Sequence, residues 1–382
     1  MNLIPFKAKL KDTVFFGDGT LNKLGELAND FGFKRPLLVA DRGLVNSGHV
    51  QKAIGHLEKT GCDPIVFDDF KENPDSLMVS KGKEFAGQFN IDSIIGLGGG
   101  SSLDCAKGIN FLLTNGGCMQ DYRGYGKASE NFLPMIGEPT TAGTGSEAQS
   151  YALITDNNTN MKMACGDPKA IFNAVILDPV LTLSQPIQVS VAAGFDAISH
   201  AIESYVSTQR NSFSEEYSCE AWRILQNSYT RMLENSNNLN ARAGMLLGAH
   251  FAGVAIENSM LGASHACANP LTCFHGITHG VAIGILLPKV VRWNMPVVGD
   301  RYHELIQIVE SGNLDEDNPE ELACQLEEMV RLGNMPSTLG HFDIFEDDLS
   351  RLANAAAKQW TGQFNPRAFD RSGALEVYRS SL

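Results

Sequence analysis

Histidine and aspartate are concentrated in two short segments in the second half of the chain. Asp196 and His200 lie four residues apart in the segment GFDAISHAIESY, which favours a helix. This spacing places both side chains on one helix face, where they can bind the same ion. Further along, His265, His275 and His279 lie within SHACANPLTCFHGITHG. One carboxylate with several imidazoles suits Zn(II) or Fe(II) better than Mg(II) or Ca(II), so the two segments predict a transition-metal site.

The role of each histidine depends on its neighbours. A lone histidine on an apolar face is usually a packed core residue. We interpret the five isolated histidines in this way: His49, His56, His250, His303 and His341. Within the cluster, His275 is ambiguous, because it is either a further imidazole ligand or a polar neighbour of a substrate.

A glycine-rich loop follows the apolar run SIIGL and reads Gly98-Gly99-Gly100-Ser101. Glycines let the backbone turn sharply and approach a ligand closely. Ser101 is then expected to be a helix N-cap, with Asp104 as its capping-box partner. Free N–H groups at such a helix start attract a pyrophosphate. The loop therefore predicts phosphate binding. It matches neither the Rossmann fingerprint nor a Walker loop, and the alternative is a tight turn between a strand and a helix.

Two more features fit a dinucleotide. Asp41 ends the apolar run RPLLVA. A carboxylate at such a strand end accepts hydrogen bonds from an adenosine ribose and repels a 2′-phosphate, which favours NAD over NADP. The alternative for Asp41 is a helix N-cap. The loop TTAGTGSE at residues 140–147 combines hydroxyls with bare backbone, and is either a contact for the nicotinamide end or an ordinary turn.

The two halves of the chain predict different elements around these residues. Up to residue 185, short runs rich in Ile, Val and Leu alternate with amphipathic stretches, which predicts parallel strands and helices. The expected strands are 35–40, 64–68, 93–97, 133–137 and 174–178. After Pro186 the expected helices are 188–206, 214–232, 241–258, 315–332 and 347–359. We therefore predict an α/β domain with a parallel sheet over residues 1–185 and an all-helical domain over residues 186–382.

Composition excludes several kinds of partner. The 382 residues are 43% hydrophobic and 19% charged, with a net charge of −14. This balance is globular and argues against binding to nucleic acid or to an anionic membrane. We expect no signal peptide in MNLIPFKAKLKD and no uncharged apolar stretch of about 18 residues that would span a membrane. Eight cysteines without a C-x-x-C pair indicate thiols in a reducing compartment, so we expect a cytoplasmic protein.

Taken together, GGGSSLDCAK, TTAGTGSE, GFDAISHAIESY and the histidine-rich segment resemble the motifs of the iron-containing alcohol dehydrogenase family. They occur in one order along essentially the whole chain, and a late Asn365-Pro366-Arg367 is similar as well. The resemblance implies the dehydroquinate synthase-like fold of that family, with a dinucleotide-binding α/β domain, a helical metal-binding domain and a cleft between them. It also implies hydride transfer between NAD(H) and a small primary alcohol, diol or aldehyde, with Fe²⁺, or alternatively Zn²⁺, polarising the substrate oxygen.

Site residues follow from the resemblance residue by residue. It implies four metal ligands, Asp196, His200, His265 and His279. His275 is then left as a tentative proton relay or substrate contact. The implied cofactor contacts are Asp41, Gly98, Gly99, Gly100, Ser101, Thr140, Thr141, Lys162 near a ribose and Leu181 on the adenine side.

The chain departs from the family pattern at two positions. Asn269 stands where the family often has a histidine, which puts a histidine-based proton relay there in doubt. Ala148-Gln149 replaces the usual Val-Thr, and the Gln149 amide is a substitute contact for the nicotinamide carboxamide.

Other activities fit the same scaffold. A lyase similar to dehydroquinate synthase would need Lys and Arg around its substrate, whereas the segments expected to line this site are apolar or neutral. An enzyme similar to maleylacetate reductase can lack the metal, against which the full ligand set argues. We further expect a homodimer.

Overall fold

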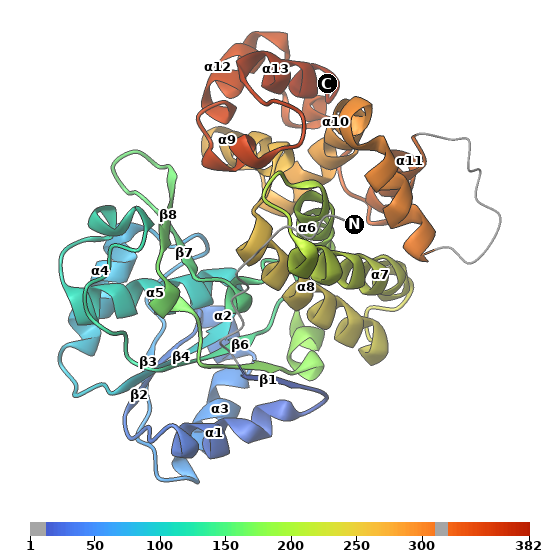
Figure 1. Cartoon of the computed structure of the whole chain (residues 1–382). Helices are drawn as coiled ribbons and strands as arrows, with labels where there is room; N and C mark the ends of the chain where they lie inside the picture. The colour runs from blue at the N-terminus through green and yellow to red at the C-terminus, as the bar shows by residue number, and fades with distance from the viewer. Residues whose placement is uncertain (1–12, 310–319) are drawn as a thin grey trace. The chain divides into compact units, whose positions relative to one another are not determined.

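The computed structural model describes residues 13–309 and 320–382. These residues form two compact units that divide between Gln185 and Pro186, and each unit is described by itself (Figure 1). The segment in which we expected no signal peptide lies outside the described residues, as does the start of the expected helix 315–332.

The N-terminal unit is built on a six-stranded, wholly parallel sheet, as predicted. Its strands are β1 (Thr13–Phe16), β2 (Pro36–Val39), β3 (Ile65–Phe67), β4 (Ser93–Gly98), β6 (Met135–Pro139) and β9 (Ala174–Leu177), in the order β1-β9-β6-β4-β2-β3. All five predicted strands are present. The sequence did not indicate β1, because this edge strand is largely exposed and lacks a buried apolar run.

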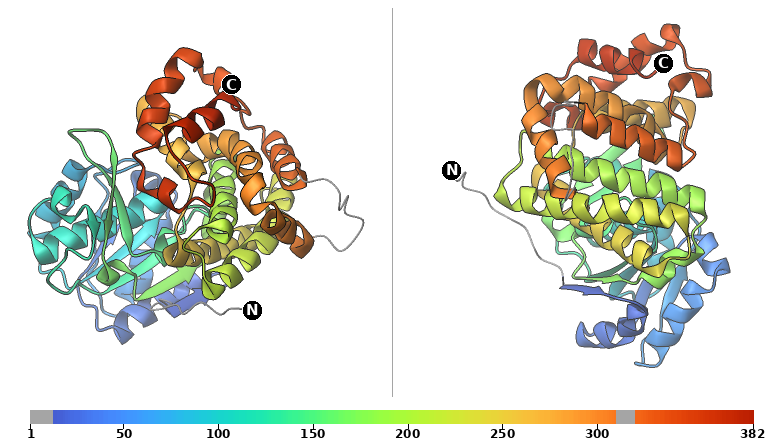
Figure 2. Two further views of the ribbon diagram at one scale, coloured as in Figure 1. Left: turned by 45° about the horizontal axis from the view of Figure 1, so that its top comes forward. Right: turned by 90° about the vertical axis from the view of Figure 1, so that its right-hand side faces the viewer.

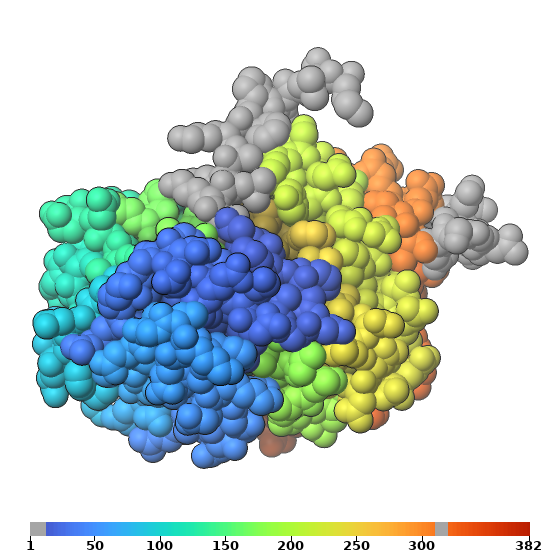
Figure 3. Space-filling model, turned by 90° about the horizontal axis from the view of Figure 1, so that it is seen from below, coloured from blue at the N-terminus to red at the C-terminus, as the bar shows by residue number. Residues whose placement is uncertain are grey.

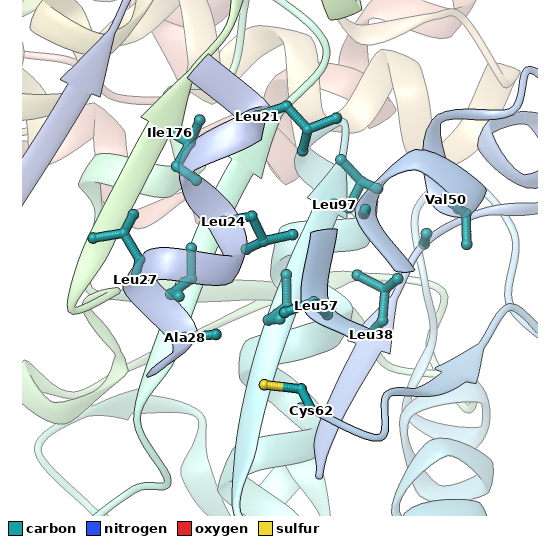
Figure 4. Close-up of a cluster of buried hydrophobic side chains, with 14 of the residues drawn as sticks. Leu21, Leu24, Leu27, Ala28, Leu38, Val50, Leu57, Cys62, Leu97 and Ile176 are labelled. Atoms are coloured by element: carbon teal, nitrogen blue, oxygen red, sulfur yellow. The ribbon is translucent and has the colours of Figure 1, made fainter. Parts of the chain in front are cut away.

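Helices cover both faces of this sheet. On one face lie η1 (Thr20–Lys23), α1 (Leu24–Asp30) and α3 (His49–Glu58), which form the surface seen in Figure 3. Their apolar side chains pack on the strands in a buried cluster (Figure 4) that includes Leu21, Leu24, Leu27, Ala28, Leu38, Val50, Leu57, Cys62, Leu97 and Ile176. On the other face lie α4 (Ser76–Ala86) and α5 (Gly100–Asn115). The short α2 (Arg42–Asn46) follows β2.

A second, three-stranded sheet was not predicted. It contains β5 (Gly124–Tyr125), β7 (Tyr151–Thr155) and β8 (Lys162–Gly166), with β7 and β8 antiparallel. In β7, partly buried and buried residues alternate, which is the pattern of a strand with one covered face. Short 3₁₀ turns complete the unit: η2 (Met119–Tyr122), η3 (Ser146–Ala148), η4 (Pro168–Ala170) and η5 (Pro179–Ser184).

The C-terminal unit contains helices and no strand among its described residues, as predicted. Its helices are α6 (Ile187–Val206), α7 (Ser212–Glu234), α8 (Leu239–Ser259), α9 (Ala263–His275), α10 (His279–Val309), α11 (Glu321–Leu332), α12 (Glu346–Ala356) and α13 (Arg371–Arg379), with short turns η6 (Leu339–Phe342) and η7 (Trp360–Phe364). Helices α6, α7 and α8 lie side by side (Figure 2). The sequence patterns missed α9 and α10, which contain internal prolines that usually interrupt a helix.

Within the described residues, α10 is long and apolar enough to cross a membrane by length and composition alone. Most of its apolar window (61%) is nevertheless buried inside the protein. Two basic side chains, Lys289 and Arg292, interrupt this stretch and form ion pairs with Glu327 of α11 at 2.7 and 2.6 Å. These features are typical of a core helix in a soluble protein.

One central strand carries a buried carboxyl group. Glu138 of β6 is fully buried, and neither of its carboxyl oxygens has a hydrogen-bond partner in the described structure. Burial raises the pKa of Glu138 well above its ordinary value, and the nearby carboxylate of Asp178 raises it further. Both effects favour the protonated form of Glu138 in the folded protein.

Glu138→Gln is expected to stabilise the protein at alkaline pH. A raised folded-state pKa means that the folded state keeps a proton that the unfolded state loses above its ordinary pKa, so stability falls as pH rises. The slope is up to about 1.4 kcal/mol per pH unit until the folded pKa is reached. Thermal unfolding of both proteins from pH 5 to pH 8 measures this difference. An equal pH dependence in wild type and variant would show that Glu138 is already ionised in the folded state.

Candidate metal and cofactor site

Three helices of the C-terminal unit bring four side chains together. Asp196 and His200 lie one turn apart on α6, His265 lies in the first turn of α9, and His279 begins α10. The Asp196 Oδ1 atom lies 3.5 Å from His200 Nε2, 3.4 Å from His265 Nε2 and 3.6 Å from His279 Nε2. His200 Nε2 and His265 Nε2 are 3.1 Å apart. The four ligands implied by the resemblance therefore converge, as a proposed site requires.

The spacing of Asp196, His265 and His279 fits a metal ion, because their ligand atoms all lie within 4.8 Å of one another. Ligands bound tetrahedrally at about 2.1 Å from a metal are about 3.4 Å from one another, and the distances of His200 to Asp196 and to His265 are also close to this value. Asp196 Oδ1 is buried and has no hydrogen-bond partner among the described residues. A buried carboxylate oxygen without a partner is costly, and an ion bound between it and the imidazoles would satisfy it. One carboxylate and three imidazoles fit Fe²⁺ or Zn²⁺.

The carboxylate and the imidazoles lie so close together that they shift one another's pKa. Burial raises the pKa of Asp196, but the neighbouring imidazoles outweigh this effect and hold that pKa below its ordinary value. Burial lowers the pKa of His265, yet the carboxylates of Glu203 and Asp196 outweigh burial and raise that pKa to about 9. The carboxylate of Asp196 and the neighbouring imidazoles thus stabilise one another's charged forms.

Glu203 orients one of the four side chains. It lies one turn after His200 on α6 and is buried. One carboxylate oxygen accepts a hydrogen bond from the backbone N–H of Ser264 at 2.7 Å, and the other pairs with His265 Nδ1. This contact directs His265 Nε2 towards Asp196, as carboxylates behind metal-binding histidines commonly do. The sequence analysis overlooked Glu203, although its spacing of seven from Asp196 places both on one helix face.

The Asn365-Pro366-Arg367 segment supports the start of α9. Asn365 Oδ1 accepts hydrogen bonds from the backbone N–H of Ala263 and from Asn294 Nδ2, each at 3.1 Å. Arg367 donates to the Trp293 carbonyl oxygen at 2.7 Å and stacks over its indole ring. The segment therefore anchors the helix that carries His265.

The two remaining polar candidates also lie on α9. His275 is exposed at the C-terminal end of α9 and does not belong to the convergent group. Asn269 Nδ2 donates to Gln359 Oε1 at 3.1 Å, which ties this side chain to the chain between α12 and η7. A proton-relay role for His275 stays a prediction.

The predicted cofactor features follow neighbouring strands of the N-terminal unit. β2, β4 and β6 are adjacent in the sheet, and each continues into one of the loops that the sequence singled out. Gly98 at the end of β4 pairs with Pro139 at the end of β6, so the glycine loop and the 140–147 loop leave the same edge. Nucleotides bind at the carboxyl edge of such parallel sheets.

The glycine loop begins a helix, but its capping differs from the prediction. α5 starts at Gly100 with Gly99 as N-cap and no side-chain cap. The expected capping box of Ser101 and Asp104 is therefore wrong: Ser101 Oγ accepts from the Asn73 N–H at 3.0 Å, and Asp104 is buried against Ser146. Gly98 has φ +147°, and a Cβ atom there would lie 2.2 Å from Ser102 Oγ. A helix N-terminus without a side-chain cap keeps its N–H groups available to phosphate.

Asp41 is a helix N-cap, which was the alternative considered for it. Its Oδ1 accepts hydrogen bonds from the backbone N–H groups of Gly43 and Leu44, at 2.8 and 3.3 Å. Its Oδ2 lies 3.4 Å from Ser102 Oγ in the first turn of α5. The carboxylate is thus next to the glycine loop, and its Oδ2 atom takes no part in capping α2. The ribose contact stays a prediction.

Some of the other predicted cofactor residues lie in the 140–149 loop, and the others lie in a strand or in the hydrophobic core. Thr140 donates its backbone N–H to the Gly98 carbonyl oxygen at 3.0 Å, and Thr141 lies against Gly99. Gln149 Nε2 donates to the Thr144 carbonyl oxygen at 2.7 Å, which leaves Oε1 for the predicted carboxamide contact. Lys162 begins β8 and is partly buried. Leu181 is almost fully buried in the hydrophobic cluster, where its observed role is packing.

A parallel α/β unit and a helical unit with an Asp-His₃ cluster define a class of metal-dependent dehydrogenases. Models of this class match both units: iron-containing alcohol dehydrogenase over residues 12–179, and the C-terminal domain of the Fe-containing alcohol dehydrogenase family over residues 190–382. The chain therefore belongs to the iron-containing alcohol dehydrogenase family. This confirms the predicted family, fold and reaction class, an NAD- and metal-dependent alcohol oxidoreductase.

Individual relatives agree over nearly their whole length. The chain is 31% identical to 1,3-propanediol dehydrogenase of Citrobacter freundii, covering 96% of each chain. It is 28% identical to NAD-dependent methanol dehydrogenase of Bacillus methanolicus, covering 96% of this chain and 97% of the relative. Among solved structures, an alcohol dehydrogenase from Oenococcus oeni is 29% identical, with a TM-score of 0.95 and coverage of 99% of this chain and 100% of the other.

Proposed function

We propose that this protein interconverts small primary alcohols or diols and their aldehydes with NAD(H), using an Fe²⁺ ion held by Asp196, His200, His265 and His279. The observation that carries the proposal is that three imidazole nitrogens lie 3.4–3.6 Å from the buried Asp196 Oδ1 atom, which has no hydrogen-bond partner among the described residues. Zn²⁺ suits the same donors and is the alternative metal.

The chemistry divides between cofactors and protein. When bound, the ion supplies a Lewis acid for the substrate oxygen, and the nicotinamide accepts or donates the hydride. Asp196 and the three imidazoles would hold the ion, with each imidazole binding in its deprotonated form, and Glu203 orients His265 through its contact with Nδ1. The N-terminus of α5 and the 140–147 loop provide the N–H groups and hydroxyls for the dinucleotide. The proton is relayed by water, by the cofactor ribose or by His275.

The substrate class follows the names of the relatives. Those names include 1,3-propanediol, methanol and lactaldehyde, all short-chain substrates with hydroxyl or aldehyde groups. The test is absorbance at 340 nm with a panel of short alcohols, diols and aldehydes and both nicotinamide cofactors. Turnover of short members with NAD is the expected result. NAD and metal binding without turnover of any alcohol or aldehyde would instead favour a lyase similar to dehydroquinate synthase.

Asp41→Asn is expected to weaken the preference for NAD over NADP. Asparagine is as good an N-cap as aspartate, so helix α2 keeps its cap while the negative charge near the ribose is lost. We expect the ratio of kcat/KM for NAD to kcat/KM for NADP to fall by about tenfold, because a carboxylate repels the 2′-phosphate. An unchanged ratio would mean that Asp41 acts only as the cap of α2.

Assembly and location complete the proposal. We infer a cytoplasmic homodimer. All eight cysteines are free, which suits a reducing compartment. Light scattering coupled to size-exclusion chromatography tests the dimer, and a mass of one chain at micromolar concentration would contradict it.

A further inference from the structure

Lys107 is a fully buried cation at the middle of α5. Its ammonium group donates hydrogen bonds to the backbone carbonyl oxygens of Ser146 at 2.6 Å, Gln149 at 2.7 Å and Tyr151 at 2.9 Å. An ammonium group has three N–H donors, so one side chain gathers three carbonyls of a single loop. Such charge-assisted bonds in a buried site are stronger than neutral ones.

Asp104, one turn earlier on α5, forms a hydrogen bond with the same loop. Its Oδ1 accepts a hydrogen bond from Ser146 Oγ at 2.7 Å. Burial raises the pKa of Asp104, and the nearby ammonium of Lys107 opposes that rise. The two side chains therefore form a buried brace, Asp104 and Lys107, between α5 and residues 146–151.

The brace connects two parts of the proposed cofactor site. α5 begins at the glycine loop, where a Cβ atom on Gly100 would lie 2.8 Å from the Thr144 side chain. The segment between these contacts contains Gln149, whose side chain bonds back to the Thr144 carbonyl at 2.7 Å. The helix that offers its N-terminus to the pyrophosphate thus also fixes the shape of residues 144–149.

We propose that Lys107 is a positioning residue that holds residues 144–149 in the conformation that binds the nicotinamide end of NAD(H). It acts through the three carbonyls and does not itself contact the cofactor. The inference rests on the proposed function, because it assumes that this loop contacts the nicotinamide. Without the cation, the carbonyl oxygens of Ser146, Gln149 and Tyr151 would each lose a charge-assisted hydrogen bond, and the loop would rearrange to hydrate them.

The test compares two ligands that share the adenosine diphosphate group. NADH reaches both the glycine loop and residues 144–149, whereas ADP lacks the nicotinamide and its ribose. In Lys107→Met, we expect the Kd for NADH to rise about tenfold or more, the effect of losing at least one buried charge-assisted hydrogen bond. The Kd for ADP is expected to change by less than about twofold, since the contacts at the start of α5 remain. Isothermal titration calorimetry measures both.

Asn110→Leu is the matched control. Asn110 is also buried on α5, one turn after Lys107, and its amide exchanges hydrogen bonds with the backbone of Leu133 at 2.8 and 3.1 Å. This variant also leaves buried backbone groups unpaired, but away from residues 144–149. We expect it to lower the melting temperature. We expect the Kd values for NADH and for ADP to change by the same factor. An equal loss of both ligands in Lys107→Met, or no loss of either, would overturn the proposal.

Ser146→Ala keeps the test decisive if Lys107→Met does not fold. It removes the hydroxyl that donates to Asp104 and that also lies 3.4 Å from Lys107 Nζ, but keeps the three carbonyls that accept from Lys107. A selective loss of NADH affinity of about threefold or more is expected from the lost hydroxyl contacts, and equal effects on both ligands would again contradict the proposal. A wild-type protein that binds ADP but not NADH would contradict the proposed function itself.

Discussion

Asp196→Asn is expected to release the metal and abolish alcohol oxidation. The substitution keeps the shape of the side chain but removes the only negative charge among the four converging atoms. A dication would then face three imidazoles in a buried site with no anionic ligand among the four atoms. Because even residues behind the ligands change metal affinity by about 10–100-fold, we expect a loss of more than about a hundredfold here. Competition with a chromogenic chelator measures the affinity.

Ser199→Ala provides the control for Asp196→Asn. Ser199 is buried on the same helix beside His200, and its hydroxyl donates to the Asp196 carbonyl oxygen at 2.7 Å rather than towards the imidazoles. We expect this variant to retain metal and turnover, and both variants to keep NADH binding by the N-terminal unit. Full metal occupancy in Asp196→Asn would contradict the proposed ligand set.

Glu203→Gln is the second substitution with a large expected effect. Glu203 accepts hydrogen bonds at both carboxylate oxygens, from the Ser264 N–H and from His265 Nδ1. Glutamine offers one acceptor and one donor, so it cannot accept from both N–H groups. His265 would then lose its orientation or its tautomer, and we expect metal affinity to fall by about 10–100-fold.

Rescue by added metal distinguishes a residue that orients a metal ligand from a residue that takes part directly in catalysis. Excess Fe²⁺ is expected to restore most of the turnover of Glu203→Gln, because the ligands themselves remain. Glu304→Gln is the matched control, since Glu304 accepts a 2.5 Å hydrogen bond from Tyr205 of α6 without contacting the four ligands. Unchanged metal affinity in Glu203→Gln would show that the contact with His265 does not support the site.

The sequence predicted most of the sheet because burial on both faces leaves a simple pattern. Runs such as SIIGL are largely apolar, since every residue of β4 is buried. β1 escaped prediction because it is an exposed edge strand, and β7 because its covered face shows only alternate residues. Helices α9 and α10 were not predicted because both contain proline. In these helices, tertiary packing outweighs the cost of the hydrogen bond that each proline removes.

Spacing located the proposed metal ligands but did not reveal their partners. The i, i+4 pair of Asp196 and His200 is a local feature, whereas their approach to His265 and His279 depends on the packing of three helices. The capping box at Ser101 failed because Asp104 forms a tertiary hydrogen bond with Ser146 instead of a local one. Lys107 carried no sequence signal, since its three acceptors are backbone carbonyls.

Anaerobic metal reconstitution tests the central claim most directly. Chelator-stripped protein is titrated with Fe²⁺ while NADH formation from 1,3-propanediol and NAD is followed at 340 nm. The four converging side chains predict no turnover before metal is added and a rise that saturates near one ion per chain. Turnover that persists in the stripped protein, or that Asp196→Asn retains, would contradict the metal site and the mechanism built on it.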